Sequence, residues 1–226
     1  MERLSSGKRI NSAMEDAAGL TIAHSLETKI KSLETAARNA NDAISLIHLG
    51  EGALDAVSSM LVRMRELATQ ALNGTYGETD RKNLNAEFKQ LEDEIDRISN
   101  NTFFNGISVI GQQLTAAGNN ASTDPDYFAD SSSPSDVDGD NRLSFQIGYS
   151  STDAIKMNIR DMSSDEIGKV TGNGNAGAVS AQDILTVTKA GYALKSVDAA
   201  LTEVDNYRVE MGSVANRLDH TIENLY

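Results

Sequence analysis

The feature that most constrains this chain is a heptad-like series of apolar residues near its C-terminus. The series advances by alternating steps of three and four residues, and only the charged residue Arg208 interrupts it. A helix over residues 181–226 would run on the order of 60 Å at ~1.5 Å per residue, which is too long to be stable without a partner along its length. The series consists of Ala190, Leu194, Val197, Leu201, Val204, Arg208, Met211, Ala215, Leu218, Ile222 and Leu225.

The N-terminal third supplies a second long helix with the same periodicity. Gly50 and Gly52 interrupt its apolar stripe, and each costs up to ~1 kcal/mol relative to Ala in a helix. We interpret them as a weak point in one helix rather than a break. Asn73, Gly74 and Gly77 then predict its end. The stripe consists of Leu26, Ile30, Leu33, Ala37, Ala40, Ile44, Ile47, Leu54, Val57, Leu61, Met64, Ala68 and Ala71.

A third helix is predicted from Thr79 to about Ser99. Its apolar residues again fall at steps of three and four, so it would return antiparallel to the helix before it. The expected fold is therefore mainly α: a long antiparallel helical rod, or coiled-coil-like bundle, of three main helices. The residues that carry the third stripe are Leu84, Phe88, Leu91, Ile95 and Ile98.

Between the third and the last helix the pattern changes to that of a small β element. Asn105-Gly106 is a strong turn pair, and apolar residues alternate on both sides of "SSTD", which predicts a hairpin over residues 142–162. We divide the chain into five parts. They are residues 1–110 (N-terminal part of the helical core), 111–141 (variable surface insert), 142–162 (β-hairpin), 163–180 (linker) and 181–226 (C-terminal core helix).

Composition argues against several functions. The net charge of −13 makes nucleic-acid binding a poor fit, because phosphate neutralisation needs clustered Lys and Arg. No apolar run reaches the roughly 18 residues of a membrane span. With no cysteine and three scattered histidines, we expect no metal, no cofactor and no catalysis. In "DVDGDN" (136–141) the glycine is misplaced for an EF-hand, so a hydrated turn is the simpler interpretation and calcium binding stays open.

Several long blocks of this sequence resemble bacterial flagellin, in the flagellin order. They are "ERLSSGKRINSAMEDAAGLTIA", "ARNANDAISLIHLGEGAL", "LVRMRELATQALNGT", "EIDRISNNTFFNGISVI", "SFQIG" and "MGSVANRLDHTIENL". Together the blocks leave out little more than residues 111–141 and about 163–180. Their length and order make the resemblance very specific.

The resemblance implies a structural subunit of the bacterial flagellar filament that forms a homopolymer with other flagellin subunits. It also implies an extracellular location, reached through the flagellar secretion channel without a cleaved signal peptide and with the help of an export chaperone. Because the apolar series reaches Leu225 and the chain begins abruptly, we expect a core that lacks the terminal polymerisation segments. The alternative is a hook-filament junction protein, which shares the paired-helix plan.

The resemblance further implies that Toll-like receptor 5, a vertebrate innate immune receptor, reads one flank of the rod. The matching residues are Arg63, Leu67 and, on the third helix, Glu87. Leu67 follows Arg63 by four residues, so the two share a helix face, and with Glu66 beside them the pattern is typical of an exposed apolar anchor with a charged rim. The alternative is that Arg63 and Glu66 are solvated charges and Leu67 is peripheral core.

Residues 2–23 also resemble the flagellin epitope that a plant receptor kinase senses. The epitope-like residues are Glu2, Arg9, Asn11, Asp16 and Gly19. The sequence departs from the epitope at Lys8, Met14, Glu15 and Thr21, and Glu15 places a longer acidic side chain in the contact region. The same stretch is equally typical of a helix-entry loop, so plant recognition is an expectation.

Overall fold

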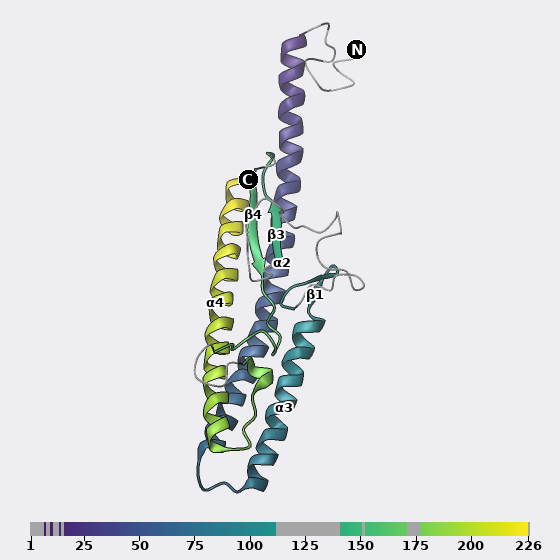
Figure 1. The fold of residues 1–226 in the computed structure, drawn as a ribbon. Coiled ribbons are helices and arrows are strands. Elements are labelled where there is room, and N and C mark those ends of the chain that lie inside the picture. The colour runs from purple at the N-terminus through teal and green to yellow at the C-terminus, as the bar shows by residue number, and fades with distance from the viewer. Residues whose placement is uncertain are drawn as a thin grey trace.

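The computed structural model describes residues 16–111, 141–150, 152–170 and 177–225, together with residues 7, 10 and 14. The elements are α2 (Ala17–Leu72), α3 (Glu78–Asn101), β1 (Phe103–Phe104), β2 (Ile107–Ser108), β3 (Asn141–Gln146), β4 (Ala154–Ile159), the 3-10 turn η1 (Val179–Ala181) and α4 (Val187–Leu225). They form an elongated rod, and the N-terminal part of α2 extends beyond the other elements (Figure 1). The predicted mainly α rod of three helices with small β elements is confirmed.

Helices α2 and α4 pair antiparallel along most of the length of α4. Asp55 forms an ion pair with Arg208, and Arg65, further along α2, pairs with Asp198, earlier in α4. Alongside these pairs runs a fully buried apolar seam, which includes Leu54, Leu61 and Met64 of α2 and Val197, Val204 and Met211 of α4. Arg208, the break in the predicted series, therefore lies at the edge of the seam, where its charge reaches a partner on α2.

Gly50 is buried within α2, and the helix runs through it without a break. A Cβ at this position would stand 2.8 Å from Val109 Cγ1 and 2.9 Å from Met211 Cε, both too close for real contacts. A Cβ at Gly52 would meet nothing within 4 Å. Gly50 is thus a packing position as well as a weak helix former, whereas Gly52 has no such role.

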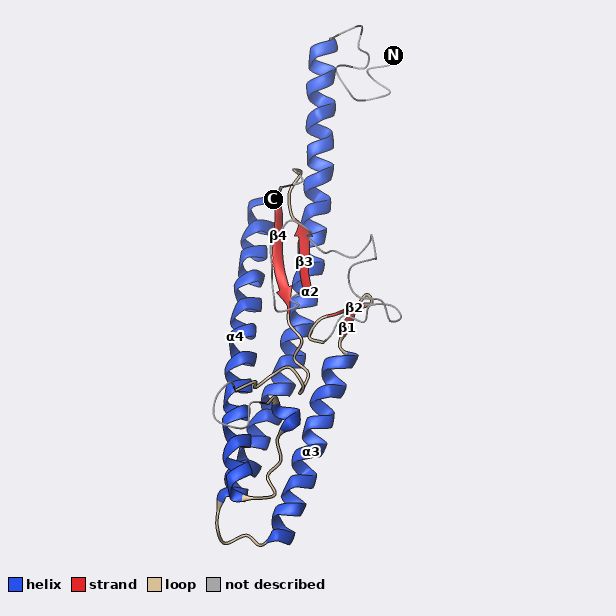
Figure 2. Ribbon diagram, viewed as in Figure 1, coloured by secondary structure: helices blue, strands red, loops and turns tan. Residues whose placement is uncertain are grey.

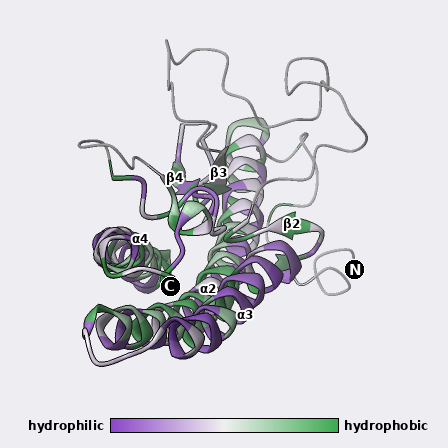
Figure 3. Cartoon of the chain, turned by 60° about the horizontal axis from the view of Figure 1, so that its bottom comes forward, coloured by the Kyte–Doolittle hydropathy of each residue, from purple (hydrophilic) through white to green (hydrophobic). Residues whose placement is uncertain are grey.

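Helix α3 turns back along α2 after a short connection. The Arg81 side chain caps the end of α2, donating from Nε to the carbonyl of Ala71 at 3.0 Å and from a terminal nitrogen to that of Asn73 at 3.2 Å. Phe88 and Ile95 are fully buried on the apolar face of α3. The rest of α3 is strongly hydrophilic, in contrast to α2 (Figure 3). Helix α3 is therefore apolar on one face only.

The two small sheets confirm the predicted turn and the predicted hairpin. Asn105 and Gly106 both have positive φ, +50° and +83°, between the paired strands β1 and β2. Strands β3 and β4 pair antiparallel, and the hairpin lies along α2 and α4 (Figure 2). The Tyr207 hydroxyl of α4 donates to the Asn158 carbonyl at 3.2 Å, which ties α4 to β4.

The stretch expected to be a linker, residues 163–180, is packed against the core where the structure describes it. We call residues 161–170 and 177–186 the return segment; residues 171–176 lie outside the described residues, as do residues 112–140 of the predicted insert. Met162, Ile167, Val179 and Ile184 are buried in the core. The Thr186 hydroxyl accepts a hydrogen bond from the Lys189 amide at 3.3 Å, as an N-cap residue does. Helix α4 begins at Val187, and not near residue 181 as the sequence analysis predicted.

The N-terminal part of α2 carries apolar side chains that are exposed in the described structure. Ile22, Leu26 and Ile30 are more than half exposed, although the sequence placed Leu26 and Ile30 on the core stripe. This part of α2 lies beyond the end of α4 (Figure 1). The stripe therefore continues past the region that α4 covers.

Candidate functional site

The charged residues expected at the receptor-binding flank come together where α2 and α3 lie side by side. The Arg63 guanidinium lies 2.9 Å from the Glu66 carboxylate of its own helix and 2.7 Å from the Glu87 carboxylate of α3. Its Nε also donates to Glu87 at 2.8 Å. Arg63 thus joins two carboxylates from two helices, and we call Arg63, Glu66 and Glu87 the charged flank.

The charged flank faces solvent. The side chains of Arg63, Glu66 and Glu87 are 49%, 60% and 44% exposed. The pKa of Arg63 is raised from its ordinary value, mainly by its hydrogen bond to Glu87 and then by that to Glu66. An arginine that grips two carboxylates with its planar fork holds a defined arrangement of charges for a partner to meet.

Leu67 does not stand on the surface, and the expectation of an exposed leucine anchor is wrong. Its relative exposure is 1%, and it belongs to the main core cluster. The sequence argument considered one apolar seam along α2, but α2 packs against α3 as well as α4, so its buried arc is wider than one seam. Val62, 47% exposed, is an apolar residue on the surface of this part of α2, four residues before Glu66 on the same helix face, and the sequence argument missed it.

Among the plant-epitope-like residues, the structure describes Asp16 and Gly19, while Glu2, Arg9 and Asn11 lie outside the described residues. Asp16 is the N-cap of α2: its carboxylate accepts a hydrogen bond from the Gly19 amide at 2.8 Å. A side chain at residue 19 would collide with this carboxylate, because a Cβ there would lie 2.3 Å from it. The two residues therefore form one helix-starting unit.

The described residues hold no group of three or more histidines, aspartates and glutamates placed to bind a metal ion. Residues 136–140 of the acidic "DVDGDN" stretch lie outside the described part of the chain, so calcium binding there stays untested. Within the described residues, none of the helices is long and apolar enough to cross a membrane.

Comparison with known proteins gives a consistent result. Residues 1–115 match the family model described as the bacterial flagellin N-terminal helical region. The flagellin of Bacillus subtilis is 40% identical to this chain, over 100% of the chain and 73% of the relative. The flagellin of Halalkalibacterium halodurans is 37% identical, over 100% of the chain and 70% of the relative.

Solved structures agree on the fold. The crystal structure of Bacillus cereus flagellin superposes with a TM-score of 0.62 at 31% identity, covering 83% of this chain and 88% of that one. A putative flagellar hook-associated protein from Vibrio parahaemolyticus gives a TM-score of 0.65 at 18% identity, covering 95% of this chain and 94% of that one. The second likeness shows a shared fold alone, so the sequence relatives distinguish the flagellins from the hook-associated alternative.

The first and last long helices of this rod pair along an apolar seam, and most of the charged side chains in the described part of the chain lie on the surface. With relatives of this identity and coverage, the chain belongs to the flagellin family. It is a structural subunit of the bacterial flagellar filament, the extracellular assembly of flagellin subunits that serves motility.

Proposed function

We propose that, besides its role in the filament, this chain is a ligand of Toll-like receptor 5 through the charged flank. The family resemblance selects Arg63, Leu67 and Glu87, and the helix pattern adds Glu66 beside them. The observation that supports the proposal is the bridge in which Arg63 of α2 holds Glu87 of α3 at 2.7 Å. A receptor that reads these charges would recognise two helices at once, and hence the folded rod.

Leu67 contributes to this surface from beneath. Because its side chain is only 1% exposed, it can support the helix surface that carries Arg63 but offers a receptor almost no surface of its own. Val62, adjacent to Arg63 and about half exposed, supplies the apolar contact instead. A small apolar patch within a charged rim is the arrangement that hot spots in protein interfaces favour.

The test is the affinity of the purified chain for the Toll-like receptor 5 ectodomain, measured beside an Arg63→Ala/Glu87→Ala variant. We expect affinity to fall at least about tenfold, since a central interface residue contributes more than about 1 kcal/mol. The matched control is Arg65→Ala/Asp198→Ala, which removes a similarly exposed ion pair between α2 and α4. Binding that is equal in all three proteins, or absent in all three, would refute the proposal.

We also infer that the charged flank packs between subunits in the filament, so that the receptor meets it on monomers only. The support is its position on the outer side of the α2–α3 pair, where a neighbouring rod can reach it. The inference predicts that cross-linked filaments, which cannot shed monomer, do not stimulate the receptor. Stimulation by such filaments at the level of free chain would contradict it.

Three further partners follow from the family resemblance and stand as proposals. A peptide of residues 2–23 should elicit a response from the plant receptor kinase, and replacing Glu15 by Asp should strengthen that response. A peptide that elicits no response would contradict this proposal.

Export through the flagellar secretion channel with a chaperone predicts that the chain leaves cells with an intact export apparatus and co-purifies with the chaperone. Secretion by a channel-deficient strain would contradict that route.

A further inference from the structure

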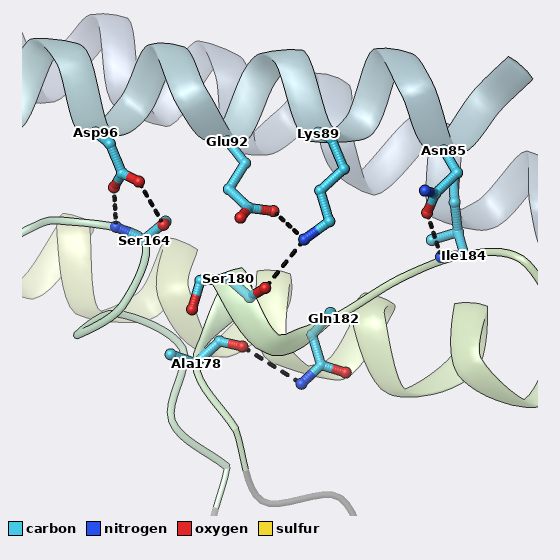
Figure 4. Close-up of polar contacts among 9 residues, drawn as sticks. All are labelled: Asn85, Lys89, Glu92, Asp96, Ser164, Ala178, Ser180, Gln182 and Ile184. Carbon is cyan, nitrogen blue, oxygen red and sulfur yellow. Dashed lines mark hydrogen bonds and ion pairs between the residues drawn. The ribbon is translucent and has the colours of Figure 1, made fainter. Parts of the chain in front are cut away.

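A stripe of polar residues runs along α3 directly beside its apolar face. Asn85, Lys89, Glu92 and Asp96 follow one another at steps of four, three and four, so they lie on one face of the helix. Figure 4 shows all four pointing toward the return segment. We call these four side chains the polar clasp. An apolar stripe would be the usual way to attach a neighbouring segment, so the polar clasp is a distinct kind of contact.

The polar clasp holds the main chain of the return segment. The Asp96 carboxylate accepts from the Ser164 amide at 2.7 Å and from its hydroxyl at 2.9 Å. The Lys89 ammonium donates to the Ser180 carbonyl at 3.0 Å. The Asn85 side-chain oxygen accepts from the Ile184 amide at 2.9 Å (Figure 4). Two backbone amides of the return segment thus have α3 side chains as their acceptors.

A different bond ties the return segment to α4. The Gly168 amide donates to the Glu203 carboxylate of α4 at 3.1 Å. Gly168 has a φ of +75°, and a Cβ there would lie 2.5 Å from the Ser196 carbonyl, so the segment approaches α4 closely at this point. The attachments to α3 and to α4 can therefore be followed separately, through the Ser164 and Ile184 amides on one side and the Gly168 amide on the other.

Glu92 is the buried charged member of the polar clasp. Its side chain is 11% exposed, and its carboxylate accepts from Lys89 at 2.8 Å. Burial raises the pKa of Glu92, Lys89 acts against that shift, and the neighbouring Asp96 and Asp93 add to it. Lys89 thus connects the Glu92 carboxylate to the Ser180 carbonyl.

The charges that act on Glu92 all belong to α3 itself. The return segment and α4 also carry charged side chains on the elements that pack against this side, but none of them contributes to the raised pKa of Glu92. Glu166 pairs with Lys169 and Asp183 with Lys189. The return segment also carries Asp161 and Asp165. Besides Lys189, the charged residues of α4 are Lys195, Asp198, Glu203, Asp205, Arg208, Glu210, Arg217, Asp219 and Glu223.

We propose that the polar clasp is a pH-responsive attachment, which holds the return segment more firmly at acidic pH and loosens as pH rises through the range in which Glu92 loses its proton. The direction follows from linkage: the folded protein binds a proton at Glu92 more readily than the unfolded chain does. This contribution to stability is fully present below the ordinary glutamate pKa of about 4.3 and is lost as pH rises through the higher folded pKa. Lys89 stays half exposed and can keep its bond to Ser180 when Glu92 is neutral.

Amide hydrogen exchange of the whole chain between pH 5 and 8, corrected for intrinsic exchange rates, tests the proposal. We expect the protection of the Ser164 and Ile184 amides to fall as pH rises, by at most about tenfold for each pKa unit that separates folded from unfolded Glu92. The Gly168 amide, which is bound to α4, should change less. Protection of Ser164 and Ile184 that is constant with pH would overturn the proposal.

Two variants test whether the pH dependence of amide protection comes from the Glu92 carboxyl. Glu92→Gln keeps the shape and removes the charge, so it should give the acid-like protection at every pH. Asp93 makes only the smallest of the contributions to the raised pKa of Glu92, so Asp93→Asn should keep most of the pH dependence of the parent. If Glu92→Gln does not fold, an NMR titration of the Glu92 carboxyl in the parent protein decides the matter. Titration above the other glutamates supports the proposal, and titration among them refutes it.

Discussion

Helix α2 and helix α3 hold their partners by different means. The contact of α2 with α4 is an apolar seam whose fully buried residues repeat at the helical period. The contact of α3 with the return segment adds side-chain hydrogen bonds to backbone groups, at the polar clasp. The seam gains free energy from the area it buries and is insensitive to charge, whereas the clasp depends on charged and polar groups being satisfied. The two contacts should therefore fail under different conditions.

The largest effect should come from the seam. Leu54 is fully buried where α2 meets α4, so Leu54→Ala leaves a cavity and should lower the free energy of unfolding by about 2–5 kcal/mol. Urea unfolding followed by circular dichroism measures the change. Val62→Ala, at an exposed position of the same helix, is the control and should stay within about 0.5 kcal/mol. If both variants lost the same free energy of unfolding, burial in the seam would not be what stabilises the contact between α2 and α4.

The next largest effects on stability are expected at Gly50 and Gly52 of α2, and the two effects should have opposite signs. Gly50→Ala forces a Cβ to within 2.8 Å of Val109 and 2.9 Å of Met211 and should cost about 1–3 kcal/mol through overpacking. Gly52→Ala meets open space and should stabilise α2 by roughly 0.5–1 kcal/mol. Thermal unfolding of both variants is sufficient. A stabilising Gly50→Ala would mean that α2 and α4 are not in close contact at this level.

A smaller loss is expected at the polar clasp. Asp96→Ala removes the acceptor of the Ser164 amide and hydroxyl, and Ser164 is fully buried. An unsatisfied buried donor costs about 1–3 kcal/mol, less any gain from relieving repulsion with Glu92. Asp93→Ala, one turn away and exposed, is the control and should leave urea unfolding nearly unchanged. Identical behaviour of the two variants would show that the bonds to Ser164 contribute little.

The smallest effect should come from Glu92→Gln, and its sign depends on pH. Because burial raises the pKa of Glu92, the charged form costs the folded state stability at neutral pH. The variant should therefore have a slightly higher urea midpoint than the parent at pH 7.5, and this difference should shrink as pH falls toward the ordinary glutamate range. A lower midpoint for the variant at pH 7.5 would mean that the pair with Lys89 outweighs burial.

The seam was predictable from sequence, and the polar clasp was not. Alternating steps of three and four residues mark an apolar stripe whatever its partner is, so the pairing of the first and last helices could be inferred. The spacing of Asn85, Lys89, Glu92 and Asp96 is equally regular, but polar residues at helical spacing are typical of any solvated face. Their acceptors and donors are backbone groups of the return segment, which carry no sequence signal.

The candidate site shows the same division. Arg63 and Glu66 are three residues apart on one helix, so their contact could be inferred, whereas Glu87 was placed beside them only by the family resemblance. Leu67 was misplaced because its burial depends on a second partner for α2. The role of Gly50 also required the structure, because a close approach between helices cannot be seen in either sequence segment alone.

The most direct test of the contrast between seam and clasp is native-state hydrogen exchange in increasing urea, followed residue by residue. If the two contacts are separate, the Ser164 and Ile184 amides will show a lower opening free energy than the amides around Leu54 and Met211, and the two groups will merge only as global unfolding is approached. If all these amides share one opening free energy and one dependence on urea from the outset, the rod opens as a single unit and the contrast is wrong.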